Sequence, residues 1–177
     1  MRRILVTLAI LVSLVSPATA AAADNGTVSA QVTVPAVAPC ITVGDPIDYG
    51  TVQFSTPGDV NKTAFGASTY TSCSPDAQKI YVRGTPATSA SSDARWTLAQ
   101  GSFFLCDTGP NVYGVLASDS PDGSRSSVAL HDSDQLMNPT AAPGTAYPLR
   151  TTLFMPCSGS TGAGETMTFS IILTASF

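Results

Sequence analysis

Prolines and glycines interrupt this sequence so often that helix signals are almost absent from it. The 177 residues include 13 prolines and 14 glycines, and both residue types disfavour helix interiors. No window has the sustained apolar period of 3.6 residues that marks an amphipathic helix. Short alternating or β-branched runs lie between the breakers instead. The sequence therefore predicts an all-β domain, either a sandwich or a small barrel, with little helix.

The alternating runs give an approximate map of the strands. We expect residues 68–73 and 78–83 to form a hairpin around Ser74-Pro75-Asp76. Three segments rich in small and polar residues, 84–93, 118–127 and 131–147, are expected to be exposed loops. The expected strands are residues 27–34, 41–43, 47–54, 68–73, 78–83, 95–99, 112–117, 149–155 and 166–175.

The first residues have the three parts of a secretory leader. Arg2 and Arg3 are followed by an apolar run over residues 4–15 and by the small-x-small sequence Ala18-Thr19-Ala20. The run is shorter than the roughly 20 apolar residues that span a membrane. We expect a signal peptide over residues 1–23, cleaved after Ala20 or Ala23. The expected organisation is then an N-terminal extension or first strand over 24–38 and a β-sandwich over 39–177.

The leader places the mature chain outside the cell or at its surface. No later stretch is long and apolar enough to be a transmembrane helix. Loss of Arg2 and Arg3 leaves six basic against twelve acidic side chains, a net charge of −6. Nucleic-acid binding needs clustered Lys and Arg, so we expect no nucleic-acid partner.

Four cysteines lie in this exported chain. An even number in an oxidising compartment predicts two disulfides, and their long spacings exclude a C-x-x-C zinc or redox site. Three pairings are possible, of which we favour Cys40–Cys73 and Cys106–Cys157. Each would stabilise the fold by about 3–4 kcal/mol, mostly by restricting the unfolded chain.

No residue pattern indicates catalysis, a metal or a cofactor. His131 is the single histidine, and no G-x-S-x-G elbow accompanies it, so we interpret it as a loop histidine. The acids Asp119, Asp122, Asp132 and Asp134 match no complete calcium loop and are expected to form a solvated acidic loop. Trp96 is expected in the core under the second sheet. We expect no enzyme and no cofactor.

Alternating apolar stripes occupy both ends of the mature chain. Phe169, Ile171 and Leu173 lead one stripe, which continues to Phe177. The other consists of Val28, Ala30, Val32 and Val34, and it precedes Pro35. Both stripes fit ordinary core or edge strands of one closed domain. They also fit strand exchange, in which the N-terminal strand of one molecule fills a groove in another.

The order of these features resembles the bacterial pilus-subunit group, including secreted proteins of the spore-coat-U type. The alternating segment 27–34 precedes Cys40, and a strand ends at Cys73. Gly164 lies fourteen residues from the end, counted inclusively, as a glycine does in many pilus subunits. The segments that carry the rest of the resemblance are Ile47-Asp48-Tyr49-Gly50, Val112-Tyr113-Gly114-Val115-Leu116 and Gly162-Ala163-Gly164-Glu165.

The resemblance implies an immunoglobulin-like sandwich that lacks its last strand. A periplasmic chaperone, and then the N-terminal extension of the next subunit, would complete it. Val28, Ala30, Val32 and Val34 would be donor residues, and Phe169, Ile171 and Leu173 would flank the acceptor groove. Arg95-Trp96-Thr97-Leu98 is also similar to the W-x-L surface domains, which bind cell wall.

We therefore expect a secreted structural or adhesive surface protein that assembles by donor-strand exchange with itself or with other subunits. The alternative is a monomeric extracellular module that binds cell-wall glycan. A secreted hydrolase is the third possibility, and it is disfavoured because the chain has one histidine and no nucleophile motif.

Overall fold

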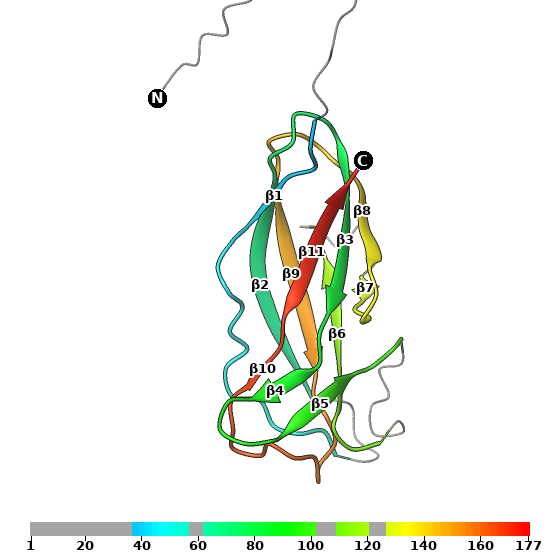
Figure 1. The fold of residues 1–177 in the computed structure, drawn as a ribbon. Coiled ribbons are helices and arrows are strands. Elements are labelled where there is room, and N and C mark those ends of the chain that lie inside the picture. Colours follow the sequence, from blue (N-terminus) through cyan, green and yellow to red (C-terminus); the bar gives the residue numbers. More distant parts are fainter. Residues whose placement is uncertain (1–36, 57–61, 102–108, 121–126) are drawn as a thin grey trace, which may run out of the picture. The chain divides into compact units, whose positions relative to one another are not determined.

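A computed structural model describes residues 37–56, 62–101, 109–120 and 127–177, and these residues are all-β. Their strands form two sheets that face each other as a sandwich (Figure 1). No helix occurs in the described ranges. The predicted fold class is thereby confirmed at the level of an all-β sandwich. Accordingly, no helix that could cross a membrane is present among these residues.

Among the described strands, eight form the larger sheet, and all but one of their pairings are antiparallel. The exception is the parallel pair β5–β6. β7 (Val128–Ala129) lies off the main path and pairs with β6. The path itself runs in the order β1 (Ile41–Val43), β2 (Thr63–Ser72), β9 (Ala146–Phe154), β6 (Val112–Ser118), β5 (Arg95–Leu98), β4 (Ala87–Ser89) and β10 (Met167–Thr168).

The smaller sheet has the order β11 (Ile171–Ser176), β3 (Gln78–Gly84) and β8 (Gln135–Ala141). β3 continues into β4 after Thr85-Pro86, where the chain changes sheets. Proline cannot donate to a ladder, so it suits this interruption. The chain also changes sheets between β10 and β11, next to the change between β4 and β3. Met167 of β10 pairs with Ser89 of β4, and Ile171 of β11 pairs with Gly84 of β3. The C-terminal run therefore stays beside the β3–β4 run along its whole length.

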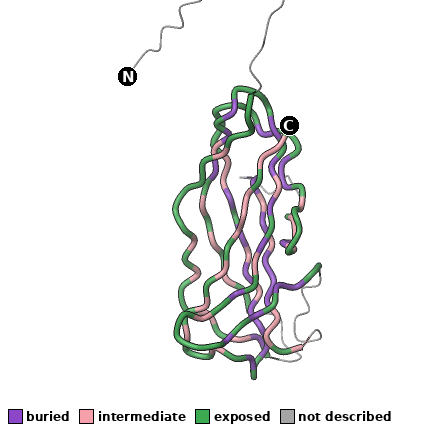
Figure 2. Tube along the Cα trace, viewed as in Figure 1, coloured by how far each residue is buried: buried purple, intermediate pink, exposed green. Residues whose placement is uncertain are grey.

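The core fills the space between the sheets. Along β2, exposed positions alternate with less exposed ones, as expected for a strand with one solvated face (Figure 2). Trp96, on β5, is 6% exposed, which confirms its predicted place in the core. The fully buried aromatic and aliphatic side chains include Tyr70, Ile80, Val82, Tyr113 and Val115.

One disulfide joins the start of β1 to the end of β2. Cys40 and Cys73 are bonded, with their Cα atoms 5.1 Å apart, as predicted. The backbone N–H of Cys73 also donates to the carbonyl of Cys40, at 3.0 Å. Cys157 is disulfide-bonded too. Its predicted partner, Cys106, lies outside the described residues, so that pairing stays a prediction.

Several local predictions are wrong. Residues 68–72 and 78–83 lie in strands, but these do not form a hairpin, because β2 pairs with β1 and β9 while β3 pairs with β11 and β8. Residues 47–54 form no strand. Two expected loops contain strands, namely β4 within 84–93 and β8 within 131–147.

Candidate functional site

An apolar groove of about 1130 Å³ opens along one side of the sandwich. Its floor includes Leu149, Leu153 and Met155 of the β9 region, which are each 5% exposed. The predicted residues Phe169, Ile171 and Leu173 all line it, and all three pack against the core. The structure therefore brings together the three C-terminal residues that the sequence selected. Val28, Ala30, Val32 and Val34 lie outside the described residues.

The C-terminal run forms one wall of the groove and presents an open backbone edge. The N–H of Ser170 donates to Thr85 Oγ1 at 2.9 Å, and its carbonyl accepts from the N–H of Thr85 at 3.1 Å. The backbone of Ser170 therefore faces the β3–β4 run. Because successive residues of a strand turn their N–H and C=O groups to opposite edges, those of Ile171 and Leu173 face away from β3. Among the described strands, β11 pairs with β3 alone, so this edge is available to another strand.

Residues 45–54, which we call the strap, form the opposite wall. The strap follows β1 and runs beside β2 in extended form (Figure 1). Ile47, Tyr49, Val52 and Phe54 are its half-buried side chains. The spacing changes from two to three residues between Tyr49 and Val52, at Gly50, whose φ is +64°. This left-handed residue breaks the strand alternation, which explains why the predicted strand does not form.

The strap supplies both ends of a row of aromatic rings. Phe54 contacts Trp96 edge to face, with centroids 5.9 Å apart. Trp96 contacts Tyr113 at 6.3 Å, and Tyr113 contacts Phe169 at 5.1 Å. Phe169 in turn stacks on Tyr49 at 5.9 Å. The indole N–H of Trp96 donates to the Thr161 carbonyl at 2.8 Å. These rings give the groove a rigid aromatic end, because aromatic side chains combine large contact area with few rotamers.

A buried polar cluster joins the two sheets near the C-terminal end of β2. Asp119 follows β6 and is 2% exposed. Its Oδ2 accepts from the hydroxyl of Tyr70 on β2 and from Nδ2 of Asn138 on β8, both at 2.6 Å. The expected solvated acidic loop is therefore wrong for Asp119, since two buried donors hold its carboxylate. Asp134 is exposed and lies 3.6 Å from Arg83 Nε, and Asp122 lies outside the described residues.

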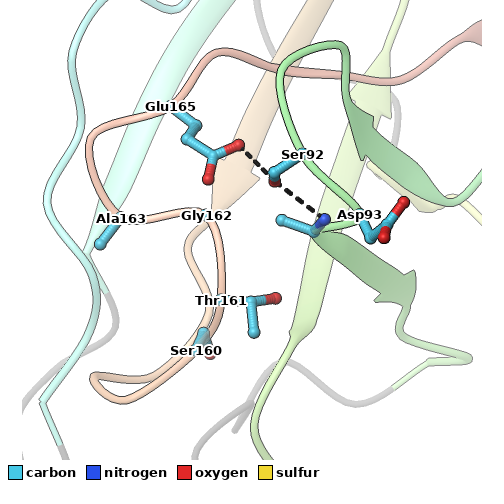
Figure 3. Close-up of a pocket in the computed structure, with 8 residues that line it drawn as sticks. Ser92, Asp93, Ser160, Thr161, Gly162, Ala163 and Glu165 are labelled. Carbon is cyan, nitrogen blue, oxygen red and sulfur yellow. Dashed lines mark hydrogen bonds between the residues drawn. The ribbon is translucent and has the colours of Figure 1, made fainter.

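A second, polar pocket of about 540 Å³ lies between the β4–β5 turn and the loop before β10. In it, Ser92 Oγ donates to Glu165 Oε2 at 2.6 Å (Figure 3). Ser91 Oγ donates to the same oxygen at 3.1 Å. Hydrogen bonds from Ser89, Ser92 and Ser91 hold the pKa of Glu165 below its ordinary value. These bonds join the β4–β5 turn to the loop before β10.

The remaining predicted polar residues do not gather into a catalytic or metal site. The carbonyl of His131 accepts from the N–H of Gly84 at 2.8 Å, so this residue has a backbone role beside β3. No group of three or more metal-ligating side chains occurs in the part of the chain that the structure describes.

Alkaline pH should destabilise this protein. Burial raises the pKa of Tyr70 and Tyr113 well above the ordinary value, and Asp119 raises that of Tyr70 further. The two folded tyrosines stay neutral above pH 10, while those of the unfolded chain ionise. The free energy of unfolding therefore keeps this contribution below about pH 10. Above that pH it falls by about 1.4 kcal/mol per pH unit for each tyrosine. Urea unfolding between pH 8 and 11 checks this. Unchanged midpoints over that range would contradict it.

A scan against protein-family models finds no match for this chain. A search of curated proteins finds no matching relative either.

Proposed function

We propose that this protein is a secreted structural or adhesive surface component that assembles by strand addition. In this mechanism the apolar N-terminal segment of one copy enters the groove of another copy or of a related subunit. The observation that carries the proposal is the edge of β11 that no other described strand pairs with, above an apolar groove. A strand added there gains main-chain hydrogen bonds from the edge and side-chain contacts from the floor.

The order of the strands supports an immunoglobulin-like arrangement with one strand missing. One sheet contains β1-β2-β9-β6, and the other begins at β11 and continues through β3 to β8. In a complete immunoglobulin-like sandwich the second sheet has one more strand beyond the position of β11. The groove lies at that position, between β11 and the strap.

The N-terminal stripe matches the groove in length and chemistry. Residues 28–34 and the C-terminal run 169–175, which contains the lining residues Phe169, Ile171 and Leu173, both span seven residues, or about 23 Å in extended form. The stripe residues Val28, Val32 and Val34 are β-branched and suit a pleated strand. The segment 25–34 carries no charged residue, so its insertion buries no unpaired charge.

The test is the oligomeric state of the mature chain with and without residues 24–36. We expect concentration-dependent oligomers of the complete mature chain in size-exclusion chromatography with light scattering. The truncated chain should be monomeric, with circular dichroism showing whether it keeps its β structure. Stable monomers in both cases would contradict strand addition. Sedimentation of such a monomer with cell-wall glycan would favour the alternative, a monomeric wall-binding module.

A further inference from the structure

One side chain of the strap lies across the groove. The ring of Tyr49 stacks on Phe169 of the opposite wall, with centroids 5.9 Å apart. Its hydroxyl lies 2.7 Å from Thr151 Oγ1, on the β9 floor between Leu149 and Leu153. Tyr49 therefore contacts both the opposite wall and the floor.

The inner face of β2 is shaped to accept this ring. A β-carbon added at Gly66 would lie 2.3 Å from Ile47 Cγ2 and 2.9 Å from Tyr49 Cε1. Real β-carbons do not approach other atoms so closely, so a side chain at position 66 would push the strap away. Gly66 thus lets Ile47 and Tyr49 lie directly on the sheet.

The backbone of the strap is held mainly at its two ends. The N–H of Gly44 donates to the Thr69 carbonyl, and that of Ser55 donates to the Pro156 carbonyl, both at 2.8 Å. Between them, Ser68 Oγ donates to the Asp45 carbonyl at 2.7 Å, and Gly50 N–H donates to Asp48 Oδ1 at 2.8 Å. No β-ladder pairs residues 45–54 with another described strand. Segments with few backbone partners open at low free-energy cost.

A strand that pairs with β11 needs the space that Tyr49 fills. Ile171 and Leu173 turn their backbone groups away from β3 and toward the groove, as argued above, and Phe169 lies directly before this edge. Side chains of paired strands lie about 5 Å apart on the same face. An incoming side chain next to Phe169 would therefore meet the stacked ring of Tyr49.

We propose that Tyr49 is a gate on this groove. In the empty subunit its stack on Phe169 and its bond to Thr151 close the middle of the groove. An incoming strand displaces the ring, while the strap stays anchored at Gly44 and Ser55. This inference rests on the proposed function and identifies the residue that controls entry to the same site.

Thiol labelling of the peptide-free protein tests the gate. All variants are mature chains that carry Val32→Asp, which puts a carboxylate on the apolar stripe and keeps the N-terminal segment out of the groove. Leu153→Cys reports on the groove floor. Ala117→Cys is the matched control, because Ala117 is fully buried on β6 but does not line the groove. The rate of reaction with a maleimide is measured for each.

Two substitutions should open the gate, Tyr49→Phe and Thr151→Val. Each removes one of the two hydroxyl groups that form the Tyr49–Thr151 hydrogen bond. In each variant the maleimide should react with the cysteine at position 153 about 5- to 10-fold faster than in the chain with Tyr49 and Thr151, as expected for loss of one hydrogen bond. The double substitution should be no faster than either single one, because both remove the same bond. Tyr49→Ala, which also removes the stack, should be fastest. The cysteine at position 117 should react at one rate throughout.

Two results would overturn the gate. In one, position 153 reacts at the same rate in all variants. In the other, positions 153 and 117 accelerate together, which indicates general loosening of the fold. A peptide of residues 24–36 then tests the proposed function separately. If it protects position 153, strand addition is supported and entry should be fastest without Tyr49. If it protects position 153 in no variant, strand addition fails, while the labelling rates still decide the gate.

Discussion

Replacing Asp119 by alanine should cost the fold about 3 kcal/mol or more. The carboxylate accepts hydrogen bonds from Tyr70 and Asn138, which are both fully buried. Without it, of the hydrogen bonds described for the Tyr70 hydroxyl and Asn138 Nδ2, only the one between them remains, at 3.1 Å. Each lost bond to a charged group is worth about 1.5–3 kcal/mol, and buried donors without acceptors add a further penalty. Since whole domains are stable by only about 5–15 kcal/mol, this loss is large.

Urea unfolding followed by circular dichroism measures the effect. Asp119→Asn keeps one side-chain oxygen as an acceptor, so it should cost less than Asp119→Ala. Asp132→Ala is the matched control, because this acid lies nearby in the sequence but is exposed. It should change the stability by no more than about 0.5 kcal/mol. Equal effects at positions 119 and 132 would show that the buried cluster does not stabilise the fold.

Val32→Asp should weaken assembly by at least about 100-fold. In strand addition the side chain of Val32 enters the apolar groove, whose described lining residues include Leu149, Ile171 and Leu173. A carboxylate in that place loses its water without gaining a cation, which costs several kcal/mol. The variant should stay monomeric at concentrations where the parent forms oligomers. Light scattering over a concentration series measures the shift.

Thr33→Asp is the matched control for this prediction. It adds the same charge one residue later, on the opposite face of the extended strand, where the carboxylate stays in water. It should assemble like the parent chain or nearly so. Equal loss of assembly in both variants would mean that net charge, and not a buried face, governs association.

The sequence alone predicts strands better than it predicts their partners. Alternation locates β6 and β9 closely, because one face of each is buried. The same signal led to the wrong hairpin. Tyr70 on β2 and Ile80 on β3 both point into the core, but from opposite sheets. Alternation indicates which side of a strand is buried, and it contains no information about the neighbouring strand.

The sequence predicts the residues of only one wall of the groove. The C-terminal stripe identifies Phe169, Ile171 and Leu173 because their alternation is regular. The β-branched and aromatic residues of the strap predict a strand, although the three-residue step from Tyr49 to Val52 across Gly50 argues against one. The Asp119 cluster had no local signal, because Tyr70 and Asn138 meet this carboxylate only when three distant strands come together.

Titration of the Val32→Asp chain with a peptide of residues 24–36 tests the central claim most directly. This chain keeps its own groove but cannot donate, so its groove should be empty. Isothermal titration calorimetry should give one peptide per chain, and a peptide that itself carries Val32→Asp should not bind. If the parent peptide produces no saturable binding, the groove does not accept this strand, and assembly by strand addition is contradicted.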